Sequence, residues 1–165
     1  NAKAAAMAAR DAAEAAGREV PIMLSMTITD MAGRNLSGHT VEAFWHAVRH
    51  IKPLTVGLNC SFGADLLRPH LAALARQADT LIMAYPNAGL PNDLGQYDEL
   101  PEHTASLIGQ WLEDGLINIV GGCCGTTPGH IGAIARAVAS APPRAIPTLP
   151  VQTRLSGLEP FTMAA

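Results

Sequence analysis

The stretch LTVGLNC at residues 54–60, followed by SFGADLLRPHLAALARQA at residues 61–78, decides the fold class of this chain. The first segment is a short apolar run, which is typical of a buried β-strand. In the second segment, Asp65 is expected to cap a helix whose apolar residues fall on one face. These residues are Leu67, Leu71, Leu74 and Ala78. A buried strand followed by an amphipathic helix is the building unit of a parallel α/β sheet.

The same unit recurs along the chain. Apolar runs at residues 21–26, 80–85 and 116–120 predict three more strands. The predicted helices are residues 1–18, one capped by Thr40, residues 102–114, and one from Thr127-Pro128 that buries Ile131, Ile134, Ala135 and Val138. The average spacing of about 32 residues matches the roughly 250 residues of an eight-unit (β/α)8 TIM barrel. The four units therefore predict half of such a barrel, with an open flavodoxin-like sheet as the alternative.

The composition restricts the functions that the chain could have. Hydrophobic residues make up 48% and charged residues 15% of the 165 residues, which excludes a disordered polar chain. The net charge of −3 leaves no basic footprint for nucleic acid. No apolar run approaches the roughly 20 residues of a membrane helix, and no signal peptide opens the sequence. We therefore expect a cytoplasmic protein that binds neither nucleic acid nor membranes.

Three cysteines carry the chemistry that the sequence suggests. Cys60 directly follows the second predicted strand, and Cys123 and Cys124 follow the fourth. Because sites in parallel α/β folds lie at the carboxyl ends of the strands, we expect the three thiols to lie together. Three thiolates suit a catalytic zinc ion, which has three protein ligands and an open fourth position. The alternative is that these cysteines are buried as small apolar side chains.

Other polar residues at the same edge are weaker candidates. Asn59, next to Cys60, could bind substrate or orient a ligand, although a strand-end asparagine often only satisfies backbone groups. Asn87 and Asn92 are expected to serve turn chemistry. A structural zinc ion would need a fourth ligand, and His130 is the nearest histidine. Exposure of His130 at the helix surface is an equally good expectation.

Four segments together resemble a known family. They are GLNC at residues 57–60, YPNAGLPN at 85–92, GGCCGTTP at 121–128 and RLSGLEP at 154–160. The GGCCG loop is similar to that of the homocysteine S-methyltransferase family, which includes betaine-dependent enzymes. The second and fourth segments resemble the homocysteine-binding domain of cobalamin-dependent methionine synthases.

This resemblance implies a specific architecture. Residues 1–141 would be the C-terminal half of a homocysteine-binding (β/α)8 barrel. Residues 142–165, which contain four prolines up to Pro150, would be a linker without regular structure toward a folate-binding module. A half-barrel leaves sheet edges uncovered, so a homodimer through these edges is a further expectation.

The resemblance also implies a reaction. Cys60, Cys123 and Cys124 would hold zinc, and homocysteine sulfur would be the exchangeable fourth ligand. The homocysteine thiolate would accept a methyl group from methylcobalamin, presented by another module of the same enzyme, to give methionine. Two alternatives remain at this point: an inactive zinc-binding or interaction fragment, and a betaine-type homocysteine methyltransferase.

Overall fold

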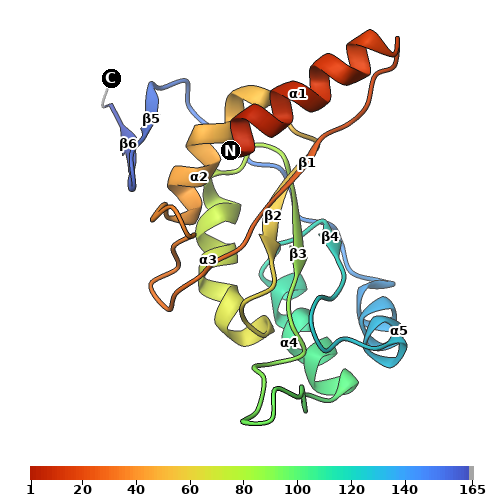
Figure 1. The fold of residues 1–165 in the computed structure, drawn as a ribbon. Helices are drawn as coiled ribbons and strands as arrows, with labels where there is room; N and C mark the ends of the chain where they lie inside the picture. Colours follow the sequence, from red (N-terminus) through yellow and green to blue (C-terminus); the bar gives the residue numbers. More distant parts are fainter. Residues whose placement is uncertain (164–165) are drawn as a thin grey trace.

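Four parallel strands form the centre of the structure, a computed structural model that describes residues 1–163 (Figure 1). They are β1 (Met23–Met26), β2 (Thr55–Asn59), β3 (Leu81–Tyr85) and β4 (Ile119–Val120). The strands pair in chain order, β1-β2-β3-β4, and every pairing is parallel. A flavodoxin-like sheet reverses its strand order at a switch point, whereas barrel strands follow one another in sequence. The sheet is therefore that of half a TIM barrel, as predicted.

The helices follow the predicted alternation with small shifts at their ends. They are α1 (Ala2–Ala15), α2 (Val41–Val48) with the short η1 (Arg49–Ile51), α3 (Ala64–Gln77), α4 (Pro101–Glu113) and α5 (Pro128–Val138). Helix α2 packs on α3, α3 packs on α4, and α4 packs on α5, as in the outer layer of a barrel. None of the helices in the described part of the chain is long and apolar enough to cross a membrane.

Two helix caps test the sequence predictions. Thr40 caps α2 as predicted, because its hydroxyl accepts a hydrogen bond of 3.2 Å from the Ala43 N–H. The prediction for α3 was wrong: Gly63 is the cap residue, and Asp65 lies in the first turn. Gly63 lies so close to the Gly89 backbone that a Cβ would be 2.9 Å from the Gly89 Cα. This close approach requires glycine at the cap, and Asp65 stabilises the positive end of the helix from inside its first turn.

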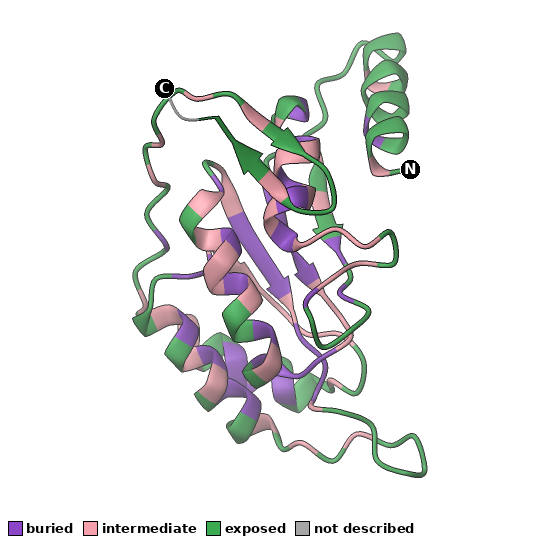
Figure 2. Cartoon of the chain, turned by 90° about the vertical axis from the view of Figure 1, so that its left-hand side faces the viewer, coloured by how far each residue is buried: buried purple, intermediate pink, exposed green. Residues whose placement is uncertain are grey.

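The core lies between the sheet and the helices, where buried residues gather on the central strands (Figure 2). The predicted buried face of α3 is confirmed, since Leu67, Leu71, Leu74 and Ala78 are all buried. The predicted face of α5 was partly wrong. Ile134 is buried as predicted, but Ile131 is 45% exposed. His130 and Ala133 are buried instead. The helix is rotated because His130 is hydrogen-bonded inward to the loop before α4.

The segment after α5 was predicted to lack regular structure, and this was wrong for residues 154–162. They form an antiparallel hairpin of β5 (Arg154–Ser156) and β6 (Pro160–Thr162). The hairpin packs on α2, where the Ser156 hydroxyl donates a hydrogen bond of 2.7 Å to the Ala43 carbonyl. Docking against α2 supplies the packing that an isolated two-stranded hairpin lacks in water.

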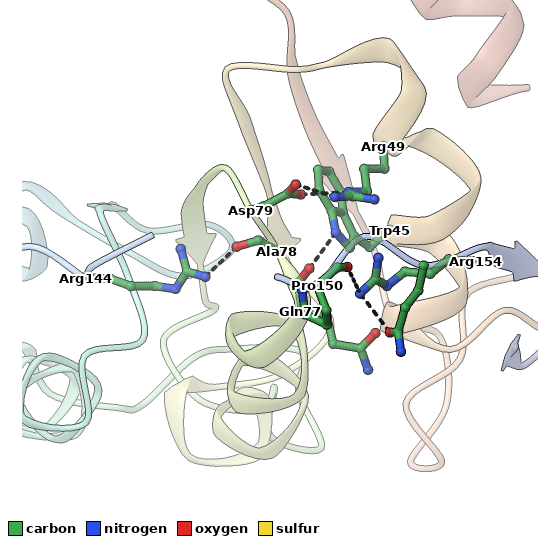
Figure 3. Close-up of polar contacts among 9 residues, drawn as sticks. Trp45, Arg49, Gln77, Ala78, Asp79, Arg144, Pro150 and Arg154 are labelled. Atoms are coloured by element: carbon green, nitrogen blue, oxygen red, sulfur yellow. Dashed lines mark hydrogen bonds and ion pairs between the residues drawn. The ribbon is translucent and has the colours of Figure 1, made fainter. Parts of the chain in front are cut away.

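Arg144 fastens the beginning of this segment to the barrel wall. The side chain is buried and donates to the carbonyl oxygens of Ala75, Ala78 and Thr80, at distances of 2.6–3.0 Å. Figure 3 shows the bond to Ala78. Two of these carbonyls end α3, where the helix dipole favours a positive charge. Burial lowers the pKa of the Arg144 guanidinium, although arginine remains protonated in proteins. The segment beyond α5 is thus an ordered strap across the end of α3.

Candidate metal centre

The carboxyl ends of β2 and β4 bring three cysteine sulfurs together. Cys60 follows β2 directly, and Cys123 and Cys124 lie in the loop after β4. The Sγ of Cys124 is 3.6 Å from the Sγ of Cys60 and 3.9 Å from the Sγ of Cys123. All three sulfurs lie within 4.8 Å of one another, and all three thiols are free. Residues more than sixty positions apart in sequence thus form one cluster, because their strands share an edge.

The spacing of the sulfurs fits a tetrahedral metal ion. With zinc–sulfur bonds of about 2.3 Å, two sulfurs on a tetrahedral ion stand about 3.8 Å apart. The distances of 3.6 and 3.9 Å lie on either side of this value. Three protein ligands also leave one position of the tetrahedron free, which distinguishes a catalytic from a structural zinc site. The donor set and its spacing could therefore hold a tetrahedral metal ion with one position open.

The backbone at Cys60 is held in a conformation that non-glycine residues rarely adopt. Cys60 has φ of 61° and Ser61 has φ of 66°, both in the left-handed region. Such strain persists only where the surroundings impose it, and it gathers at functional sites. Here the Cys60 N–H donates to the Tyr85 carbonyl at 2.9 Å, and the Ser61 hydroxyl donates to the Ile28 carbonyl. The turn aims the thiol at the edge of the sheet.

The loop that carries Cys123 and Cys124 is held by the residues that follow β3. The Cys123 N–H donates to the Pro86 carbonyl at 2.8 Å. The Cys124 N–H donates to the Asn87 side-chain oxygen at 3.2 Å, and the Ala88 N–H donates to the Cys124 carbonyl at 2.9 Å. Both cysteines are therefore positioned through their backbone by the residues that follow β3, the strand between β2 and β4.

Asn87 is the site residue that sequence reasoning missed. It is only 3% exposed and was assigned to turn chemistry, yet its side-chain oxygen accepts a hydrogen bond from the loop that carries Cys123 and Cys124. The signal was its position: Asn87 comes directly after β3, between the two strands that carry cysteines. Asn59 lies at the same edge, and its side-chain oxygen accepts hydrogen bonds from Ser25 at 2.5 Å and Thr27 at 3.4 Å.

Tyr97 packs against the cysteine-bearing loop at Gly125. Gly125 has φ of 78°, and a Cβ at this position would overlap the Cβ and Cγ atoms of Tyr97. Only glycine satisfies both the left-handed backbone and the close approach. Partial desolvation and the nearby Cys124 thiol raise the pKa of the Tyr97 hydroxyl above its ordinary value.

Cys60 and Cys123 hold their protons unequally. Burial alone would raise the pKa of Cys60, but hydrogen bonds from the Ser61 backbone, the other two thiols and Asn87 lower it below the ordinary value. Burial, together with Cys124 and Cys60, raises the pKa of Cys123 to about 11. Cys60 therefore gives up its proton more readily than Cys123 does. A bound cation would favour the thiolate form of all three cysteines.

The structure corrects the expectation that His130 could lie at the helix surface. Its side chain is 5% exposed, and both ring nitrogens have protein partners: Thr127 at Nδ1 and the Glu99 carbonyl at Nε2. Among the residues that the structure describes, the group of candidate ligand atoms consists of the three cysteines alone. His130 is therefore a structural neighbour of the centre and is not grouped with its ligands.

Comparison with protein families identifies this arrangement. The model of the family described as homocysteine S-methyltransferase matches residues 1–138, from the first helix to the end of α5. The chain belongs to the homocysteine S-methyltransferase family. The match includes all four parallel strands and all three cysteines, so the thiol cluster lies within the family's domain. It ends before the strap and the β5–β6 hairpin.

Proposed function

We propose that this chain supplies the zinc- and homocysteine-binding part of a cobalamin-dependent methionine synthase. The observation that carries the proposal is the cluster of three free thiols, spaced for a tetrahedral ion, in a homocysteine S-methyltransferase domain. Methylcobalamin as the methyl donor is supported by the resemblance of residues 85–92 and 154–160 to cobalamin-dependent enzymes. Residues 142–165 would then lead from the barrel, residues 1–141, toward a folate-binding module.

Cys60, Cys123 and Cys124 would hold the metal, and the chain positions them before it arrives. The left-handed turn at Cys60 and the hydrogen bonds that the Cys123 and Cys124 N–H groups donate to Pro86 and Asn87 fix the three sulfurs through the backbone. A zinc ion bound there would deprotonate a substrate thiol and, surrounded by three anionic cysteines, leave its sulfur electron-rich and nucleophilic. The chain's own contribution is thus preorganisation and negative charge.

The polar row beside the cluster gives the substrate a place to bind. Asn59, Ser25 and Thr27 lie at the carboxyl ends of β1 and β2 and share hydrogen bonds. Amide and hydroxyl groups can bind both the ammonium and the carboxylate of an amino acid. We propose that Asn59 contacts the amino-acid part of homocysteine, while the sulfur faces the cysteines.

The free edges of the sheet need partners. Within the described residues, β1 and β4 each pair with a strand on one side only. Further strands of the same enzyme would complete the barrel, and a second copy of the chain is the other way to cover these edges. A cluster of three reduced thiols also needs a reducing compartment, so the proposal places the protein in the cytoplasm.

The experiment is a metal and substrate titration of the reduced chain. Elemental analysis should give close to one zinc per chain for protein made with zinc and without chelator. With cobalt(II) in place of zinc, homocysteine should change the visible absorption spectrum, whereas methionine at the same concentration should leave it nearly unchanged. Zinc-free protein that is well folded would overturn the metal assignment. Zinc binding without a response to homocysteine would favour an inactive metal-binding fragment.

The methyl donor is tested separately. Methionine formation from homocysteine is expected with methylcobalamin, supplied free or on its own module, and not with betaine. The opposite preference would assign the chain to the betaine-dependent branch of the family.

A further inference from the structure

His130 is the one buried residue among the six histidines of the chain. It lies in the first turn of α5, the helix that follows the Cys123-Cys124 loop. We propose that His130 is a positioning residue of the metal centre, acting through Glu99 to hold the β3–α4 loop against Cys124. This inference rests on the proposed function only in taking the three cysteines as metal ligands.

The hydrogen bonds of His130 define the state of its ring. The Thr127 N–H points to Nδ1 at 3.2 Å, so Nδ1 is the acceptor nitrogen. In a neutral imidazole the other nitrogen then carries the hydrogen, and Nε2 donates to the Glu99 carbonyl at 2.8 Å. One nitrogen therefore caps α5, and the other reaches across to the loop that precedes α4. The two bonds have separate partners and can be removed one at a time.

Glu99 closes the β3–α4 loop on itself. Its carboxylate accepts a hydrogen bond of 2.5 Å from the Thr104 hydroxyl, and Thr104 is fully buried in α4. Gly89, at the start of the loop, lies so close that a Cβ there would be 3.3 Å from the Cβ of Glu99. The two ends of the loop therefore meet at Glu99. His130 is hydrogen-bonded to the Glu99 backbone carbonyl, and Thr104 is hydrogen-bonded to the Glu99 carboxylate.

This closed loop is the segment that contacts Cys124. Just before Gly89, Asn87 and Ala88 bind the backbone N–H and carbonyl of Cys124. Just before Glu99, Tyr97 covers Gly125. A displacement at Glu99 would be transmitted to both sides of Cys124, whose sulfur is the member of the cluster within 3.9 Å of both others. Residues that orient the ligands of a metal typically change metal affinity by 10–100-fold when they are removed.

Two substitutions separate the roles of the ring nitrogens. In His130→Asn the short amide can occupy the position of Nδ1 and keep the cap, but it cannot reach Glu99. In His130→Gln the longer amide can donate to the Glu99 carbonyl from the position of Nε2, while the cap is lost. If His130 positions the metal centre, Asn should weaken zinc affinity by about 10-fold or more. The zinc affinity of the His130→Gln variant should stay within a factor of about 3 of that of the unsubstituted chain.

The measurement is zinc affinity by competition with a chromophoric chelator, made on the whole chain. The cobalt(II) absorption spectrum of each variant reports the ligand geometry, and thermal unfolding of each metal-free protein reports the helix cap. If His130 only caps α5, the order of the two variants should be reversed: His130→Gln should be the more damaging change. The cobalt(II) spectra should then be unchanged in both variants. That order would overturn the proposal.

A variant on the loop side keeps the test independent of α5. Thr104→Val retains the shape of the buried side chain but removes the hydrogen bond to the Glu99 carboxylate, so zinc affinity should fall in the same direction as in His130→Asn. Unchanged affinity in Thr104→Val and His130→Asn, with zinc bound by the unsubstituted chain, would overturn the inference and leave the proposed function standing. Failure of the unsubstituted chain to bind zinc would instead overturn the proposed function.

Discussion

Gly125 gives the sharpest prediction about the loop that carries the cysteines, because the chain contains a matched control. Gly125 and Gly115 both have positive φ, 78° and 63°, so alanine pays a similar backbone cost at each, about 1–2 kcal/mol. At Gly115 a Cβ would meet nothing within 4 Å, whereas at Gly125 it would overlap Tyr97. The difference between the two alanine variants therefore isolates the contact with Tyr97.

The magnitude follows from this overlap. Forcing an extra carbon into a packed site costs typically about 1–3 kcal/mol, in addition to the backbone cost. We therefore expect Gly115→Ala to lower the free energy of unfolding by about 1–2 kcal/mol and Gly125→Ala by about 2–5 kcal/mol. Urea unfolding of the metal-free chain measures both values. Only Gly125→Ala should also weaken zinc binding, by about tenfold for each 1.4 kcal/mol of strain that falls on the bound state.

The reasoning would be refuted if the two variants lost the same stability and bound zinc equally. That result would mean that Tyr97 moves aside without cost and does not hold the loop. A double variant adds a check: with Tyr97→Gly already present, which removes both the Cβ and the ring, Gly125→Ala should cost no more than Gly115→Ala does.

Three further changes test other parts of the structure. Cys123→Ala should abolish stoichiometric zinc binding at micromolar concentration while the far-UV circular dichroism is retained, and full zinc content would contradict the metal centre. Arg144→Leu should lower the free energy of unfolding by about 2–4 kcal/mol in urea, because one buried and two partly buried carbonyl groups lose their donor; a loss below 1 kcal/mol would show that the strap is not fastened there. The pKa of Asp79 lies below its ordinary value because Arg49 hydrogen-bonds to the carboxylate, so this pair stabilises the fold above about pH 4 and the effect disappears as the pH falls through the lowered pKa. Asp79→Asn should therefore cost about 0.5–1 kcal/mol at pH 7, since the pair is partly exposed, and progressively less as the pH falls below about 4 (Figure 3); a cost that does not change with pH would point to a role other than charge.

The position of the cysteines could be predicted because it depends only on topology. Once the apolar runs are identified as parallel strands, residues that follow them must meet at one edge. Cys60 and the Cys123-Cys124 pair meet this condition without any knowledge of loop conformation. The same argument applied to Asn87 would have placed it in the site, but asparagine after proline is so common in turns that composition favoured the turn.

The orientation of α5 could not be predicted from its own sequence. Periodicity places Ile131 and Ile134 on one face as readily as His130 and Ala133, and hydrophobicity favours the isoleucines. The structure exposes Ile131 and buries His130 because a loop thirty residues earlier offers the Glu99 carbonyl to its ring. The hairpin of residues 154–162 is a similar case, since it is stabilised by contacts with α2 more than one hundred residues away.

The contacts that assemble the thiol cluster come mainly from three adjacent strands. Cys60 directly follows β2, the residues from Pro86 to Ala88 follow β3, and Cys123 and Cys124 follow β4. The edge strand β1 adds the polar groups Ser25 and Thr27 at the ends of the strands, and the Ile28 carbonyl after it supports the turn at Cys60. Under the proposed function, metal loading would depend on strands that are all paired within this chain, whereas methyl transfer would also require a bound amino acid and a methyl donor. Zinc content and methionine formation should consequently separate: variants along β2, β3 and β4 affect both, and variants of the polar row at β1 affect turnover while the metal remains bound.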